Sequence, residues 1–188
     1  MVDRESLKER VFAAVDGAEP MVRAYAEDIA ANAELGFFET RTSAKLAGNL
    51  ESLGLKLKKG IALTGLRADI GENKGPKVAL IGELDGIVCR NHPQANPLDG
   101  ASHSCGHNLQ TSIVLTAAAA LVRSGVMKEL DGSVALMAVP AEEFIEIDRR
   151  KKMRDEGTIA YLCGKPEFVR LGEFDDVDMA MMIHAGEF

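Results

Sequence analysis

The sequence predicts an α/β fold, with a mostly parallel sheet flanked by helices. Segments whose apolar residues recur at helical spacing alternate with short apolar runs bounded by turn residues. Three of these runs, residues 78–82, 134–139 and 177–183, lead into side chains that can bind metal ions. Because ligands of open α/β sheets bind at the carboxyl ends of the strands, this agreement also predicts where a functional site lies.

The N-terminal part is predicted to be helical. Residues 5–33 carry apolar side chains at helical spacing, and Gly17 with the proline after it divides them into two helices or introduces a kink. Residues 39–53 resume the pattern, and Thr40 or Thr42 is the candidate cap of this next helix.

After residue 54 the period changes to that of strands. Residues 55–58 alternate like a half-buried strand, and residues 63–70 form a second candidate. Residues 77–82 are a short apolar run between turn residues, which indicates a buried strand. Residues 90–100 contain two prolines, a glycine and several polar amides, so we expect a loop.

The second half repeats the alternation of helix and strand. Residues 108–124 are Ala-rich and apolar, which is typical of a buried helix, and residues 133–139 form the next buried strand. Residues 148–156 and residues 158–162 are predicted to be helical, and Gly164 is the expected cap of the second of them.

The last predicted strand covers residues 176–183, and its three methionines are expected in the core. The charged run 148–152 is interpreted as a solvated helix face.

Composition excludes several classes of protein. A chain of 188 residues suits one domain with a core, or one domain with an arm. The net charge of −7 argues against nucleic acid and against an anionic membrane surface as partners. No stretch reaches the roughly 20 apolar residues of a membrane span, and the charged N-terminus lacks the apolar core of a signal peptide. Three cysteines without framework spacing predict a reducing cytoplasm.

The strongest local signal is a thiol and two imidazoles within five residues, His103, Cys105 and His107. Side chains two residues apart diverge by about 200° on a regular helix, so Cys105 and His107 converge on one ion only in irregular backbone. Gly106 between them gives that freedom. The alternative is a buried free thiol beside a loop histidine.

Acidic and imidazole side chains at two strand ends extend this signal. Glu142 and Glu143 follow one predicted strand after Pro140, and His184 follows another. Cys105, His107, Glu143 and His184 would offer sulfur, nitrogen and oxygen ligands that suit zinc or another first-row divalent ion. Glu142 would then serve the attacking water as a proton shuttle. The alternative is a solvated acidic first turn of a helix.

Other polar residues near these strand ends have weaker signals. Glu83 and Asp85 follow a buried strand, and they either orient a ligand imidazole or only cap the strand. His103 and His92 are more typical of loop histidines than of ligands.

Four motifs in order resemble the M20 family of metallopeptidases and amidohydrolases. They are Val-Ala-Leu-Ile-Gly-Glu-Leu-Asp-Gly, Ser-Cys-Gly-His-Asn, Val-Pro-Ala-Glu-Glu and Met-Ile-His. The closer likeness is to the branch of aminobenzoyl-glutamate hydrolases and N-acyl-amino-acid amidohydrolases, and residues 34–43 also resemble a segment of that branch. The resemblance extends from about residue 26 to the C-terminus.

The resemblance implies a zinc-aminopeptidase-like catalytic domain with two divalent metal ions, Zn, Mn or Co. Cys105 would bridge them, His107, Glu143 and His184 would be further ligands, and Glu142 would be the general base. Asn108 stands where many members have Asp, which leaves the substrate class open.

Members of the family are about twice as long, so residues 1–188 are expected to be part of an M20-type catalytic domain. The lid or dimerisation domain and the C-terminal part of the catalytic domain would lie outside them.

Two classes of function follow. The first is a cytoplasmic amidohydrolase or peptidase that cleaves the amide bond of an N-acyl amino acid, an aminobenzoyl-glutamate-like conjugate or a dipeptide, as a homo-oligomer or with a complementary C-terminal chain. The second is a non-catalytic remnant or subunit that binds metal or a partner chain without turnover. A thiol-based site at Cys105 is a third interpretation, and rapid alkylation that is insensitive to metal would favour it.

Overall fold

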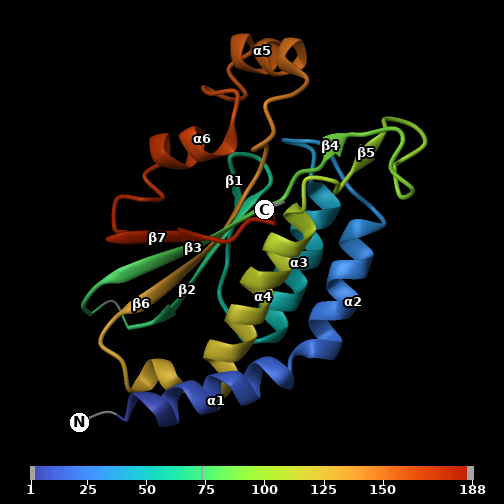
Figure 1. Ribbon diagram of the computed structural model, residues 1–188. Coiled ribbons are helices and arrows are strands. Elements are labelled where there is room, and N and C mark those ends of the chain that lie inside the picture. Colours follow the sequence, from blue (N-terminus) through green and yellow to red (C-terminus); the bar gives the residue numbers. More distant parts are fainter. Residues whose placement is uncertain (1–2, 73, 186–188) are drawn as a thin grey trace.

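A five-stranded sheet in the order β1-β2-β6-β3-β7 forms the centre of the computed structural model, which describes residues 3–72 and 74–185 (Figure 1). The helices of the described residues are α1 (Arg4–Asp16), α2 (Glu19–Ala30), α3 (Thr40–Ser52), α4 (His107–Ser124), the 3-10 helix η1 (Val126–Lys128), α5 (Ile147–Asp155) and α6 (Gly164–Arg170). The strands are β1 (Lys58–Ile61), β2 (Gly65–Gly71), β3 (Lys77–Glu83), β4 (Ile87–Val88), β5 (Ala101–Ser102), β6 (Ser133–Val139) and β7 (Met179–Met182). None of the described helices is long and apolar enough to cross a membrane.

The three strands that were predicted to end at metal-binding side chains are parallel neighbours. Val78 of β3 pairs with Val134 of β6 on one side and with Met179 of β7 on the other. The carboxyl ends of all three strands therefore meet at one edge of the sheet. Strand β2 is antiparallel to β6, and β1 is antiparallel to β2, so the sheet as a whole is mixed. The predicted α/β class, a sheet flanked by helices, is confirmed.

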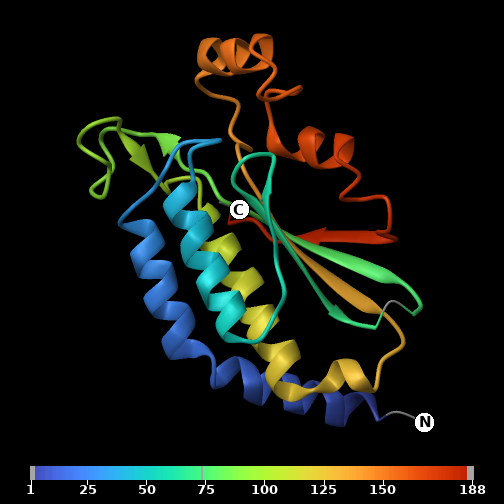
Figure 2. The ribbon, with the colours of Figure 1, turned by 180° about the vertical axis from the view of Figure 1, so that it is seen from behind.

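The central strands carry buried side chains on both faces of the sheet, since alternate residues of a strand point to opposite sides. On β6, Leu136 packs with α2, α3 and α4 on one face, whereas Met137 and Val139 pack toward Phe168 of α6 on the other. Figures 1 and 2 show α2, α3 and α4 side by side on one side of the sheet and α6 on the opposite side. Each fully buried side chain of this size stabilises the fold by roughly 1.5–3 kcal/mol.

Helix α4 begins within the Cys-Gly-His run, as the sequence predicted. Gly106 precedes it with φ of 88°, a left-handed conformation that favours glycine, and Gly125 ends it with φ of 67°. Ala118 and Ala119 are fully buried, which lets α4 lie close to its neighbours.

The structure corrects three local predictions in the first half. Strand β1 begins at Lys58, so residues 55–58 are not a strand of their own. Neither Thr40 nor Thr42 caps α3 with its side chain. Glu34 supplies that cap from a preceding turn, since its carboxylate accepts the N–H groups of Arg41 and Thr42 at 3.1 and 2.7 Å. The loop at 90–100 was predicted correctly, but the short hairpin of β4 and β5 around it was not.

Helix α6 was predicted in the wrong place. Residues 158–162 are not helical, and Gly164 begins a helix instead of ending one. Tertiary packing explains the error, because a Cβ at Gly164 would lie 1.8 Å from the carbonyl oxygen of Pro140. The Gly164 N–H also donates to the Ala141 carbonyl at 3.2 Å, which fixes the start of α6 against the turn after β6.

Arg150 contradicts the interpretation of residues 148–152 as a solvated face. Its side chain is buried, Nη1 donates to the Leu162 carbonyl at 2.9 Å, and the guanidinium lies 5.4 Å from the centre of the Phe37 ring. The contact with Leu162 ties α5 to the segment that precedes α6. Figure 1 shows α5 standing away from the sheet.

The expectation that the methionines of β7 lie in the core is also wrong. Met179, Met181 and Met182 are 54%, 57% and 37% exposed, and all four residues of β7 are exposed. The strand pairs with β3 at the edge of the sheet, and the hydrophobic pattern of the sequence does not reveal this edge position.

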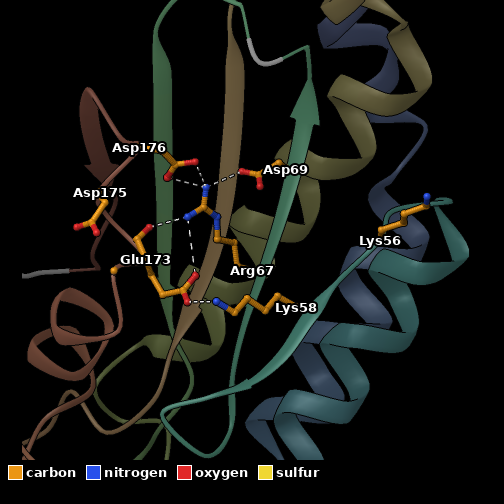
Figure 3. Close-up of a pocket in the computed structure, with 8 residues that line it drawn as sticks. Lys56, Lys58, Arg67, Asp69, Glu173, Asp175 and Asp176 are labelled. Carbon is orange, nitrogen blue, oxygen red and sulfur yellow. Dashed lines mark hydrogen bonds and ion pairs between the residues drawn. The ribbon is translucent and has the colours of Figure 1, made fainter.

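Buried cations fix the segment that leads into β7. Arg67 of β2 donates to the Glu173 carbonyl at 2.7 Å and to both carboxylate oxygens of Asp176 (Figure 3). Lys77 of β3 also pairs with Asp176. These two cations lower the pKa of Asp176. The backbone N–H of Lys77 also donates to the Asp178 carboxylate at 2.7 Å. Together these contacts set the register in which β7 starts.

Candidate metal centre

The four predicted ligands meet at the edge where β3, β6 and β7 end. One ligand atom each of Cys105, His107 and Glu143 lies within 4.8 Å of the others, and the same holds for Glu83, His107 and His184. His107 belongs to both groups. Glu83 joins them, although it was expected either to orient a ligand imidazole or only to cap its strand. The topology of the sheet brings these residues together from four separate parts of the chain.

The His107 imidazole is buried and held on both sides. Its Nδ1 lies 2.8 Å from the Asp85 carbonyl oxygen, and since a carbonyl only accepts, Nδ1 donates. Its Nε2 lies 3.0 Å from Glu83 Oε2, 3.8 Å from Glu142 Oε2 and 3.9 Å from Glu143 Oε1. The nitrogen that remains free to bind a metal therefore faces three carboxylates.

This arrangement fits a cation. His107 Nε2 and Glu83 Oε2 are buried 3.0 Å apart, and neither atom has a further hydrogen-bond partner among the described residues. Burial lowers the pKa of His107, but bonds to Asp85, Cys105 and Glu83 outweigh it and raise that pKa to about 12. The carboxylates thus favour a positive charge at Nε2, which a proton or a divalent ion can supply.

Asp85 anchors the turn that carries the two glutamates. Its carboxylate is fully buried, Oδ1 accepts the Glu142 N–H and Oδ2 accepts the Glu143 N–H, both at 3.0 Å. The same residue also touches the imidazole, with Oδ1 3.4 Å from His107 Nδ1. One buried side chain therefore couples the orientation of His107 to that of Glu142 and Glu143.

Glu39 is a site residue that the sequence reasoning missed. Its fully buried carboxylate accepts the Ala141 N–H at 2.8 Å and the Thr64 hydroxyl at 2.6 Å. Ala141 has φ of 50°, unusual for a residue with a side chain, so Glu39 stabilises a strained turn next to Glu142. Burial and the charge of Asp85 raise the pKa of Glu39 to about 7. In the sequence, the one signal that Glu39 belongs to the site was its place in the stretch 34–43, which resembles the M20 family.

We expect Glu39→Gln to stabilise the protein in mildly alkaline solution. A carboxyl whose pKa rises from 4.5 to about 7 on folding contributes stability that is complete below pH 4.5 and is lost as the pH rises through 7. The loss amounts to roughly 3 kcal/mol, and a glutamine at this position avoids it while keeping an acceptor for Ala141. Denaturant unfolding of the metal-free protein at pH 5 and pH 8.5 measures the difference. Glu9→Gln, at an exposed position of α1, is the control, and an equal effect of both variants would contradict the expectation.

A hollow of about 670 Å³ opens beside Cys105. Its lining includes His92, His103, Cys105 and Asn108. His103 is buried and belongs to neither ligand group, and burial together with His107 lowers its pKa to about 4. The hollow gives a small molecule access to the thiol side of the site.

His184 is the least covered of the predicted ligands. It lies two residues beyond β7, its ring centre is 5.5 Å from that of His107, and its Nδ1 is 2.5 Å from the Ala185 carbonyl oxygen. Its side chain is exposed, whereas His107 is fully buried. The site is therefore buried at His107 and exposed at His184, on the β7 side.

Sequence comparison finds curated relatives that are, by name, a hydrolase of an amino acid conjugate and a deacetylase. The chain is 34% identical over 131 residues to IAA-amino acid hydrolase ILR1-like 2 of Arabidopsis thaliana, covering 68% of this chain and 29% of that protein. It is 33% identical over 114 residues to N-acetyl-L-cysteine deacetylase of Bacillus subtilis (strain 168), covering 58% of this chain and 27% of that protein. The chain thus spans less than a third of the length of these relatives. No protein-family model matches it.

Solved structures share the fold. Bacillus subtilis YXEP, described as a dinuclear metal binding peptidase from the M20 family, superposes with a TM-score of 0.72 at 24% identity, over 91% of this chain and 44% of that one. The aminobenzoyl-glutamate utilization protein of Klebsiella pneumoniae gives a TM-score of 0.68 at 21% identity, over 94% and 46%. Together, the sequence relatives and the shared fold confirm the resemblance of this chain to the M20 family of metallopeptidases and amidohydrolases.

Proposed function

We propose that this chain forms the metal-binding part of a two-metal amidohydrolase. The observation that carries the proposal is the pair of ligand groups that share His107 at the carboxyl edge of the sheet. The substrate would be an N-acyl amino acid, an aminobenzoyl-glutamate-like conjugate or a dipeptide, in line with the names of the relatives. The ions would be Zn, Mn or Co, since thiolate, imidazole and carboxylate ligands suit them.

The residues that would hold the ions are Cys105, His107, Glu143 and His184. Bound divalent ions supply Lewis-acid polarisation of the amide carbonyl and acidify water. Asp85 holds the His107 tautomer in which Nε2 is free, since it engages Nδ1 through its carbonyl oxygen.

Glu142 is the proposed general base and acid. Its backbone is fixed by Asp85, yet its side chain is 35% exposed, so its carboxylate can reach a water molecule and a substrate. It would accept a proton from the attacking water and deliver it to the leaving amine. Glu143 on the next position points to Cys105 and His107, which suits a ligand.

We also propose that residues 1–188 are part of a catalytic domain, completed by a further segment or by a partner chain in the cytoplasm. The exposed strand β7 and the exposed His184 support this, because a covering segment would enclose both. The same observation favours a second candidate function, a subunit that binds metal or a partner chain without turnover.

Cobalt binding tests the metal centre directly. Titration of the purified chain with Co²⁺ should give the near-ultraviolet absorption of a cobalt–thiolate bond, and Cys105→Ser should remove that band. Cys163→Ser is the control, since its thiol contacts the Glu142 carbonyl at 4.0 Å but is in neither ligand group. The absence of any Co²⁺ uptake by the unchanged chain would refute the proposal.

A further inference from the structure

A lysine from outside the predicted site reaches into its carboxylates. Lys165 pairs with Glu83 Oε1, and its Nζ lies 3.6 Å from Glu142 Oε1. Among the residues that the structure describes, no other lysine or arginine pairs with Glu83, Asp85, Glu142 or Glu143. Lys165 is therefore the permanent cation of this cluster.

The fold holds Lys165 there. It is the second residue of α6, and the preceding Gly164 touches the chain at Pro140 so closely that no side chain fits between them. The bond from Gly164 to the Ala141 carbonyl joins α6 to the turn that carries Glu142. These backbone contacts fix where the Lys165 main chain lies relative to the cluster, and its ion pair with Glu83 directs the ammonium group into it.

Formal charges show what this cation does for the site. The carboxylates of Glu83, Asp85, Glu142 and Glu143 and a metal-bound Cys105 thiolate would carry five negative charges, and two divalent ions would supply four positive ones. Lys165 supplies the fifth. Without ions, Lys165 at Oε1 and the His107 imidazole at Oε2 together offset the buried Glu83 carboxylate, which is 1% exposed.

We propose that Lys165 is an internal counter-cation of the metal centre, which stabilises Glu83 and Glu142 when no ion is bound and competes with an ion for Glu83. Glu83 lies in one ligand group through Oε2 and holds Lys165 through Oε1, so an ion there shares this carboxylate with the ammonium group. The inference rests on the proposed metal function and adds a regulatory residue to it.

Lys165→Met is expected to have opposite effects on the two states of the site. Removal of a positive charge next to the ligands should tighten Co²⁺ binding on the order of tenfold. The metal-free protein should melt at a temperature roughly 5–10 °C lower, because the buried Glu83 loses its lysine partner and keeps only the His107 imidazole. Lys165→Gln should show the same tighter binding with a smaller loss of thermal stability, and it carries the test if the Met variant does not fold. Lys165→Arg should behave like the unchanged chain.

Lys58→Met is the matched control. Lys58 also pairs a partly exposed ammonium group with a buried glutamate, Glu173, but this pair lies in the cluster around Arg67, away from the ligand groups (Figure 3). It should lower the melting temperature and leave the Co²⁺ affinity unchanged. If the unchanged chain binds Co²⁺ and both neutral variants at residue 165 bind it equally or more weakly, the inference is wrong while the metal centre stands. If the unchanged chain binds no Co²⁺, the proposed function itself fails.

Discussion

Replacement of Glu142 by glutamine is expected to slow amide hydrolysis by ~10²–10⁴-fold and to leave the metal content unchanged. The variant keeps the size and the backbone bond of Glu142 to Asp85 but loses the group that transfers the proton. Glu142 lies outside both ligand groups, so ion binding should persist. The hydrolysis rate and the metal content are measured together, on the assembly that is active toward an N-acyl amino acid.

Glu143→Gln is the matched variant, one residue away and anchored by the same aspartate. Its carboxylate lies in the group with Cys105 and His107, so the change should weaken metal binding by tenfold or more. Burial and the adjacent carboxylates raise the pKa of Glu143, which shows that the metal-free site disfavours this charge. Identical behaviour of the two variants would contradict the proposed division of roles.

The 188-residue chain alone is expected to bind metal but to hydrolyse an N-acyl amino acid at less than about one hundredth of the rate of a completed site. His184 is exposed, and Glu83, which could be a fifth donor, is engaged by Lys165. Such a site holds two ions loosely and does not exclude water from the substrate. Steady-state assays compare the hydrolysis rate of the purified, cobalt-loaded chain with that of the assembly that is active toward an N-acyl amino acid.

The same chain is expected to self-associate through β7. In the sheet that the described residues form, β7 is an edge strand, and its exposed Met179 and Met181 make it a template for another strand. Met181→Lys should therefore shift the sedimentation profile toward the monomer, whereas Met153→Lys, at a partly buried position of α5, is not expected to do so.

Turnover by the isolated chain that disappears with Glu142→Gln would contradict the expected inactivity and would mean that a second copy completes the site.

Local signals in the sequence determined much of the fold and the outline of the site. The apolar runs at β3 and β6 and the Ala-rich α4 were predicted within a residue or so, because each has a strong period and distinct turn residues at its ends. The expectation that Glu143 and His184 lie near one another followed from a single rule, that ligands gather at the carboxyl ends of parallel strands. Cys105 and His107 joined them through their metal-binding side chains and the resemblance to the M20 family. The structure brings them together, and their roles as ligands stay a proposal.

Tertiary structure decided what pattern alone could not. Whether a run such as residues 179–182 lies in the middle or at the edge of a sheet depends on the strand order, which hydrophobicity does not encode. The buried positions of Glu39 and Arg150 depend on partners more than 10 residues away in sequence, and side chains of these types are exposed in most proteins. Lys165 likewise reaches Glu83 only because Gly164 lets α6 approach the turn after β6. Long-range contacts of this kind are set by the whole packing of the chain, and so the sequence predicted the donors of the metal centre but not the groups that hold and neutralise them.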